Sequence, residues 1–185
     1  TSRDALGVRL ASDGTVMIEK PDGGTDTLRA VERVQFEGGA LLYDILGEDT
    51  AFAYRTYAAS LGRTPDEGGL RFQLGLLEDG LSRMGLAQTF VDSLEFETLY
   101  GEDPTAEVYV DALYTNTLSR DGDAEGRAFW VEAISTGGLS RADMLVAFAE
   151  SAENVARTAD DIDNGVFVPR LEPICLACDG QDILL

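Results

Sequence analysis

The chain has 185 residues, 44% of them hydrophobic, which is enough for one domain with a core or for two small domains packed together. Its 34 acidic residues outnumber its 14 basic ones, and the net charge of −20 makes nucleic acid and anionic lipid surfaces poor partners. The sequence holds no histidine, so triads of the Ser-His-Asp or Cys-His kind cannot be built and the commonest transition-metal ligand is missing.

The sequence predicts a secreted, acidic protein that is not inserted in a membrane. No run of about eighteen apolar residues is present, and a membrane span needs such a run. The first residues, TSRDALGVRL, lack the apolar core of a signal peptide, so export is expected to use another route. Many carboxylates and a single lysine, Lys20, suit saline or calcium-rich surroundings. We therefore predict an extracellular or cell-surface location.

Residues 1–47 are expected to form a small β-meander. Apolar and polar residues alternate in short runs such as 15–18 and 31–36, which is typical of half-buried strands. Turn-forming pairs separate these runs, namely Asp13-Gly14, Gly23-Gly24 and Gly38-Gly39.

Residues 48–160 are predicted to be helical, because apolar residues recur at intervals of three and four from Ala51 to Leu61. This part repeats itself with a period of about 57 residues, and each copy of about 40 residues is long enough for three short helices. Neither copy alone could bury much apolar area, so the two are expected to pack as one domain. The predicted fold class is α+β, mainly α: a two-copy helical repeat domain with a small N-terminal β-meander and an extended C-terminal tail, 161–185.

The two copies share residues in the same order. The first pairs are Tyr57 and Tyr114, Leu61 and Leu118, Arg63 and Arg120, Asp66 and Asp123, Gly69 and Gly126, and Phe72 and Phe129. After one inserted glycine the match continues with Leu81-Ser82-Arg83 and Leu139-Ser140-Arg141, Phe90 and Phe148, and Ser93-x-Glu95 and Ser151-x-Glu153. We expect the shared tyrosines and phenylalanines, and Trp130, to lie in the core. The serines of both LSR stretches are expected to cap the third helix of each copy.

The stretch DGDAEGRAFWVE, residues 121–132, is close to an EF-hand calcium loop. Its candidate ligands are Asp121, Asp123, Glu125 and Glu132. The first copy has Thr64, Gly68 and Gly75 at three of the corresponding positions, so a non-acidic version serves the same place. Both copies keep an aspartate, Asp66 or Asp123, which a helix start needs because it accepts hydrogen bonds from free backbone N–H groups. We favour helix capping, keep calcium as the open alternative and expect no other cofactor.

Two further features have local interpretations. Arg63 and Arg120 end the first helix of each copy three residues before the shared aspartate, so an Arg–Asp bracket that locks the turn is favoured over a ligand contact.

The only cysteines, Cys175 and Cys178, form CLAC near the end of the chain, where two cysteines without histidine cannot complete a zinc site. A local disulfide is favoured there, and free thiols or a link to a partner chain stay open.

Three stretches resemble the sequence pattern of domain-of-unknown-function family 4214: YRTYAASLGRTPDEGGLRF, VYVDALYTNTLSRDGDAEGRAFW and SRADMLVAFAESAEN. The resemblance covers about residues 50–157. It implies a helical repeat similar to that of phycobilisome linker domains, carried by large exported bacterial proteins of surface-layer or adhesin type, and it implies no enzymatic activity. The sequence departs from the pattern in two places, since SRDGDAEG lacks the proline and Gln73 replaces the tryptophan.

The earlier stretch PDGGTDTLRAVERVQFEGG resembles the last turn of a repeats-in-toxin β-roll, whose loops bind calcium between parallel strands. Only GGTDTL of that loop is present, with Asp22 and Asp26 as its carboxylates. With the acidic composition and the final DILL, the resemblance implies a type I secreted protein that leaves through an ABC-type channel by an uncleaved C-terminal signal.

We therefore predict a non-catalytic extracellular bacterial module, adhesin-like, that attaches to a cell-surface glycan or protein. The alternative is a secretion and assembly module that calcium orders and whose partner is the type I secretion machinery. A minor alternative is a carboxylate-based glycoside hydrolase, because two carboxylates suffice for that reaction and Asp121 and Asp123 are a candidate pair. Nothing in the sequence fixes such a pair at the required separation, so no enzyme is predicted.

Overall fold

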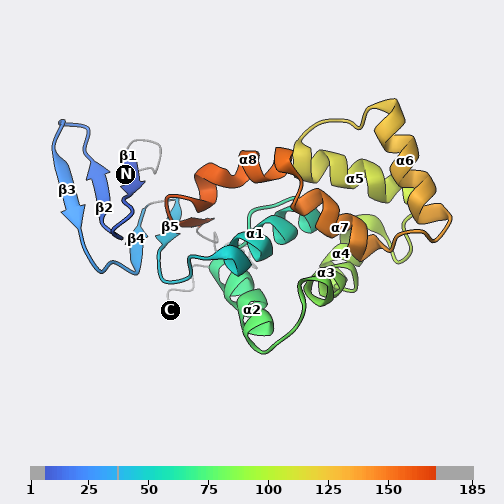
Figure 1. Cartoon of the computed structure of the whole chain (residues 1–185), viewed down its shortest axis with the longest axis horizontal. Coiled ribbons are helices and arrows are strands. Elements are labelled where there is room, and N and C mark those ends of the chain that lie inside the picture. The colour runs from blue at the N-terminus through green and yellow to red at the C-terminus, as the bar shows by residue number, and fades with distance from the viewer. Residues whose placement is uncertain (1–6, 37, 170–185) are drawn as a thin grey trace, which may run out of the picture.

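The computed structural model describes residues 7–36 and 38–169 of the 185-residue chain. In these ranges eight helices lie between five strands at one end of the chain and a sixth strand at the other (Figure 1). The strands are β1 (Gly7–Leu10), β2 (Val16–Glu19), β3 (Thr25–Leu28), β4 (Arg33–Gln35), β5 (Gly39–Leu42) and β6 (Val166–Pro169). The helices are α1 (Glu48–Leu61), α2 (Glu67–Glu78), α3 (Arg83–Val91), α4 (Leu94–Tyr100), α5 (Ala106–Leu118), α6 (Ala124–Ser135), α7 (Arg141–Ala149) and α8 (Ala152–Ile162). The predicted mainly helical α+β fold is confirmed.

The strands form two small antiparallel sheets. The first has the order β1-β2-β3, and its turns contain Gly14 and Gly23, whose φ values of 77° and 84° favour glycine. β3 carries the TDTL of the expected β-roll turn, yet it pairs antiparallel with β2, so this segment lacks the parallel strands of a β-roll. Its carboxylates already have partners, since Asp26 lies 2.9 Å from Lys20 and Asp22 accepts a backbone N–H of the turn at 2.9 Å.

The second sheet, β4-β5-β6, joins the segments that precede and follow the eight helices. Ala40 and Leu42 of β5 lie opposite Val168 and Val166 of β6, and all four are buried. The sequence predicts an extended tail from residue 161, but α8 continues to Ile162 and residues 166–169 form a strand that packs near α8. The rest of the predicted tail, with Cys175, Cys178 and DILL, lies outside the described residues.

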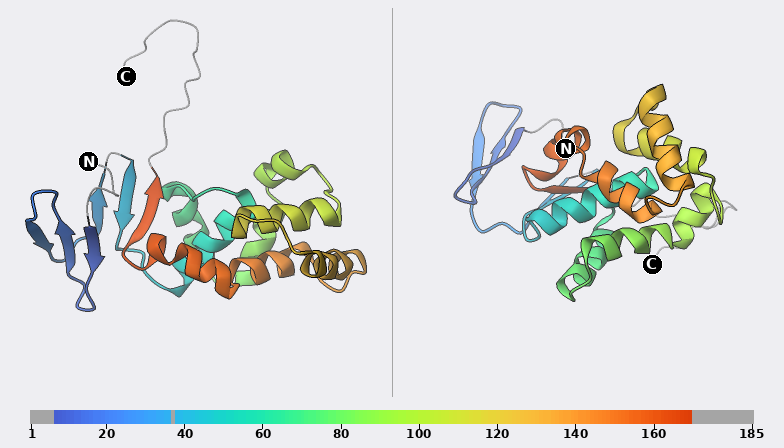
Figure 2. Two further views of the ribbon diagram at one scale, coloured as in Figure 1. Left: turned by 90° about the horizontal axis from the view of Figure 1, so that it is seen from above. Right: turned by 45° about the vertical axis from the view of Figure 1, so that its right-hand side comes forward.

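Each copy of the repeat contains four helices, one more than predicted. α1 to α4 form the first copy and α5 to α8 the second. α1 is the central helix: most of its residues are buried, and it packs against α2, α3, α5 and α7. α6 has no buried residue and packs mainly on α5; it lies at the end of the molecule opposite to β1–β3 (Figures 1 and 2). None of the helices in the described ranges combines the length and the apolar character that a membrane span requires.

Four helices, α2, α3, α6 and α7, begin at the capping residues that the sequence predicts. Asp66 accepts a hydrogen bond from Gly69 N at 2.9 Å, and Asp123 accepts one from Gly126 N at 2.8 Å. Further side-chain caps come from Ser82, Ser93, Thr105, Ser140 and Ser151. These hydrogen bonds satisfy backbone donors that the helix itself leaves free, so the shared serines and aspartates fix the starts of the last three helices in each copy.

The core is built from the same aromatic contact in both copies. The ring of Tyr57 meets Phe90 edge to face at 5.4 Å, and Tyr114 meets Phe148 at 4.9 Å. The prediction that these four side chains are buried is confirmed. Trp130 is partly buried and packs on this core.

The same prediction is wrong for Phe72 and Phe129, which are 62% and 60% exposed. Helical spacing of aromatic residues shows that a helix has an aromatic face but not which way that face points. In α2 and α6 it is the neighbouring residue, Gln73 or Trp130, that turns toward the core side.

Candidate functional site

A bidentate ion pair closes the turn after the first helix of each copy. Arg63 donates through Nε and Nη2 to Glu95 of α4 at 2.7 and 3.1 Å, and Arg120 donates to Glu153 of α8 at 2.9 and 2.9 Å. Hydrogen bonding to the glutamate raises the pKa of both arginines, so the pair stays charged. The predicted bracket between Arg63 and Asp66 exists only as a longer contact of 3.6 Å. The glutamates are therefore the main partners, and the sequence interpretation missed them.

Each of these arginines also covers a buried tyrosine. The guanidinium carbon of Arg63 lies 4.8 Å from the ring centre of Tyr57, and that of Arg120 lies 5.3 Å from the ring centre of Tyr114. Burial raises the pKa of Tyr57 to about 12, although Arg63 opposes the shift, so its hydroxyl stays protonated at neutral pH. We call each set of tyrosine, arginine and glutamate an arginine clamp.

The shared glycine makes room for this tyrosine. A Cβ added at Gly69 would lie 3.0 Å from the Tyr57 ring, and one at Gly126 would lie 2.6 Å from the Tyr114 hydroxyl oxygen. The clamp, the capping aspartate and the glycine thus form one structural unit that occurs twice.

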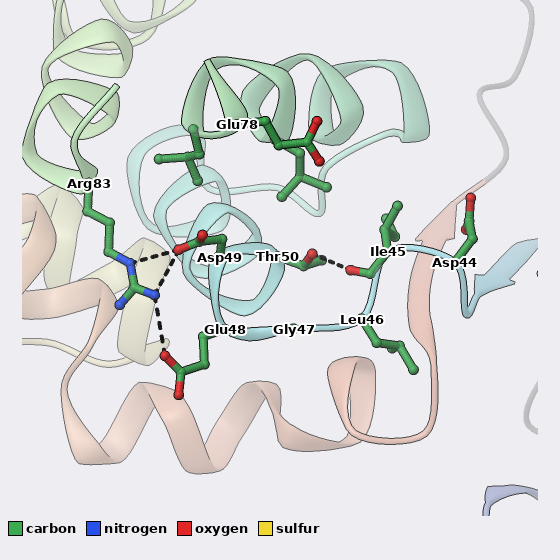
Figure 3. Close-up of a pocket in the computed structure, with 11 residues that line it drawn as sticks. Asp44, Ile45, Leu46, Gly47, Glu48, Asp49, Thr50, Glu78 and Arg83 are labelled. Carbon is green, nitrogen blue, oxygen red and sulfur yellow. Dashed lines mark hydrogen bonds and ion pairs between the residues drawn. The ribbon is translucent and has the colours of Figure 1, made fainter. Parts of the chain in front are cut away.

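A hollow of about 340 Å³ lies at the start of α1 (Figure 3). It is lined by residues 44–50, by Leu74, Leu77 and Glu78 of α2, and by Arg83 of α3. Arg83 donates to Asp49 at 2.8 Å and lies 3.8 Å from Glu48, and Figure 3 shows the three side chains facing one another. In the second copy Arg141 makes the matching contact, 2.7 Å from Asp103 just before α5. The LSR arginines therefore tie the third helix of each copy to the start of its first helix.

The hollow at the start of α1 is acidic but largely neutralised. Asp44 lies 2.9 Å from Arg71, and Asp49 is held by Arg83. A cation in this hollow would have to compete with two arginines that are already in place. We assign it a structural role, which is to hold α1, α2 and α3 together.

A smaller hollow of about 120 Å³ lies beside Trp130 in the second copy. Tyr114, Leu118, Phe148 and Trp130 give it apolar walls, and the clamp of Arg120 and Glu153 forms a charged edge. Its size suits one side chain or part of a sugar ring. In the first copy Gln73 takes the place of Trp130, and its buried Oε1 has no hydrogen-bond partner. The two copies therefore differ in the residue that lines this hollow.

The calcium candidates are spread along α6 and the loop before it. Asp121 lines an open hollow with Asp111, Gly122 and Arg127, while Asp123 caps α6. Glu125 lies in the first turn of α6 and Glu132 two turns later, both exposed. Within residues 7–36 and 38–169 no group of three or more Asp, Glu, Cys or His side chains is placed to hold a metal ion. A calcium site formed by these four residues stays a prediction.

Phe72 and Phe129 occupy the same position in the two copies, and both lie on the surface. Both are the sixth residue of the second helix of their copy, α2 or α6. Most other large apolar side chains are covered, so an exposed phenylalanine at one repeated position is a candidate contact residue.

The fold and these sites define a class of protein: a mainly helical chain built from two copies of a four-helix unit, each locked by an arginine clamp. The chain belongs to the family Domain of unknown function (DUF4214), whose model matches residues 43–99 and 87–158. The two matches correspond to the two copies. No curated protein and no solved structure matches the chain.

Proposed function

We propose that this chain is a non-catalytic attachment module of an extracellular bacterial protein, and that it binds a cell-surface component, either a glycan or another protein. The observation that carries the proposal is the exposure of Phe72 and Phe129, 62% and 60%, at the same position of the two copies. An aromatic ring on the surface offers a large apolar contact area at low entropic cost.

The proposal is supported by the roles of the other shared residues. The tyrosines and the inner phenylalanines are buried, the aspartates and serines cap helices, and the arginines pair with carboxylates. Each of these roles stabilises the fold. Phe129 contacts Trp130, but both Phe72 and Phe129 are mostly exposed, so their repetition is best explained by a contact that both copies make outside the chain.

Retention of the labelled chain on bacterial cell envelopes and on a glycan array tests this function. We expect the chain to be retained above background, and the double variant Phe72→Ser/Phe129→Ser to be retained at least about 10-fold less, because each ring removes apolar contact area. The variant Leu99→Ser/Val155→Ser is the matched control, since both side chains are exposed apolar residues on other helices. Background retention of the unchanged chain, or equal retention of the aromatic variant, would rule the function out.

We further propose that the module comes from a type I exported protein and that calcium outside the cell orders it. Its β2–β3 segment resembles a repeats-in-toxin turn in sequence only, because the two strands are antiparallel. The support is the net charge of −20, together with the pairing of most described cations inside the chain, which leaves much acidic charge uncompensated. Scanning calorimetry should show that calcium raises the unfolding temperature more than sodium chloride of matched ionic strength does. Equal stabilisation by the two salts would exclude ordering by calcium.

A further inference from the structure

We infer that the outer face of α6, defined by Phe129 with Glu125 and Glu132, is a docking surface for an arginine- or lysine-bearing segment of a partner protein. This inference rests on the proposed attachment function and names its partner chemistry. α6 is the least covered helix of the repeat domain: it has no buried residue, packs mainly on α5 and lies at one end of the molecule (Figures 1 and 2).

The three side chains share one face of the helix. Glu125 is four residues before Phe129 and Glu132 three residues after it, and residues at these spacings are neighbours on a helix surface. Phe129 is held from behind, since its ring meets Trp130 edge to face at 5.0 Å, and Trp130 in turn packs on Phe148 at 5.3 Å. The exposed ring is therefore braced by an aromatic contact that leads to the core.

The charges on this face select a cationic partner. A cation over an aromatic ring is attracted by its electron-rich face, and a carboxylate on either side adds an ion pair. Neither Glu125 nor Glu132 forms an ion pair or a side-chain hydrogen bond within the described ranges. The nearest basic residue in the helix, Arg127, is held by Asp111 at 2.6 and 2.8 Å.

Most cations within residues 7–36 and 38–169 are engaged elsewhere. Carboxylates pair with Arg9, Lys20, Arg33, Arg55, Arg63, Arg71, Arg83, Arg120, Arg127 and Arg141. The acidic face of α6 is therefore complementary to a basic segment supplied by another protein. A neutral glycan could hydrogen-bond to the two carboxylates but would form no ion pair with them.

The first copy provides a natural comparison. Phe72 is as exposed as Phe129, but Gly68 and Gly75 stand where the second copy has Glu125 and Glu132. The cationic contact is thus specific to the second copy. It can also be built into the first, because a Cβ added at Gly75 meets nothing within 4 Å and one at Gly68 comes no closer than 3.4 Å to Asp66.

Binding of a peptide of alternating arginine and glycine tests the inference. The only tryptophan of the chain, Trp130, contacts Phe129 and reports binding by its fluorescence. We expect Phe129→Leu, which keeps the apolar contact but loses the ring, to weaken binding about 2- to 5-fold. Glu125→Gln/Glu132→Gln should weaken it about 3- to 10-fold, and more salt should reduce this difference.

Two controls separate the site from the general acidity of the chain. Glu97→Gln/Glu102→Gln removes the same charge from exposed positions elsewhere and should change the affinity less than about 2-fold. Gly68→Glu/Gly75→Glu should add a second peptide site around Phe72, which calorimetry detects as a doubled stoichiometry. Variants of α6 that bind no more weakly than the charge-matched control, or an unchanged stoichiometry after the transplant, would overturn the inference.

Failure of the docking surface and failure of the attachment function give different results. If the chain is retained on cell envelopes and the α6 variants are retained equally, attachment stands and the cationic docking surface is wrong. If the peptide binds through α6 but the chain is not retained on any envelope or glycan, the docking surface stands and the attachment function is wrong.

Discussion

Arg63 and Glu95 are 32 residues apart in the sequence, yet they form a bidentate ion pair over the ring of Tyr57. The pair connects the end of α1 to the start of α4. Arg120 and Glu153 make the same connection between α5 and α8 over Tyr114. A contact that recurs at equivalent positions of both copies is a property of the repeat unit, and its loss should be measurable in stability.

The first prediction concerns this clamp. Arg63→Ala should lower the free energy of unfolding by about 1–2 kcal/mol, because it removes an exposed ion pair worth about 0.2–1 kcal/mol and a cation–π contact worth about 0.5–1 kcal/mol. Glu95→Gln should cost about 0.5 kcal/mol, since it leaves the arginine on the tyrosine. Urea unfolding measures both. Arg29→Ala, at an exposed arginine outside the clamp, should have little effect, and an equal cost there would contradict the assignment.

The second prediction uses the capping aspartate of α2. Burial by itself raises the pKa of Asp66, but the hydrogen bond from Gly69 and the charge of Arg63 outweigh it, so the pKa lies below its ordinary value. A carboxyl whose pKa is lowered by folding stabilises the protein above its unfolded pKa, and this contribution is lost as the pH falls below about 4.

Two substitutions at this position separate charge from hydrogen bonding. Asp66→Ala should cost about 1 kcal/mol at pH 7, because a backbone donor loses its cap. Asp66→Asn keeps a cap, so it should cost less at pH 7 and reduce the difference in stability between pH 6 and pH 3 relative to the unchanged chain. Unfolding by urea at both pH values is the measurement, and an identical pH dependence in the asparagine variant would contradict the charge effect.

The third prediction compares outer and inner phenylalanines. Phe72→Ala and Phe129→Ala should change the free energy of unfolding by no more than about 0.5 kcal/mol, because exposed side chains contribute little to the core. Phe90→Ala and Phe148→Ala should each cost about 3–5 kcal/mol, because they leave a cavity beside Tyr57 or Tyr114. Thermal or urea unfolding distinguishes the two groups. A large cost at Phe72 would mean that this ring is covered in solution.

Helix starts could be predicted from the sequence because capping is local. An aspartate or serine bonds a backbone N–H three residues later, so Asp66, Ser82 and Ser140 identify helix starts without knowledge of the fold. The two-copy architecture could also be predicted from the sequence, because a repeated order of residues indicates a repeated structure.

Contacts between distant segments were not predictable in this way. The pairing of β5 with β6 unites two strands of four residues from opposite ends of the described chain, and nothing local in either strand specifies its partner. The exposure of Phe129, in contrast, could have been predicted from local sequence. Its helix neighbours Glu125 and Glu132 lie on the same face, and charged residues indicate that this face is in contact with solvent. The two glutamates therefore favour an exposed Phe129, whereas the helical spacing of the aromatic residues favours a buried one.

The last prediction concerns the shared glycine. Gly126→Ala should lower the free energy of unfolding by about 1–3 kcal/mol, because its Cβ would lie 2.6 Å from the hydroxyl of Tyr114, a buried ring that meets Phe148 edge to face and has little room to move. Gly75→Ala is the matched control in an open part of α2, where alanine should stabilise the helix by about 0.5–1 kcal/mol. Urea unfolding of both variants gives the comparison. Because both substitutions replace a helical glycine, opposite signs would come from the contacts of the added Cβ at Gly126, with Tyr114 at 2.6 Å and with the capping Asp123 at 3.1 Å. Equal stabilisation would show that this position does not require a glycine.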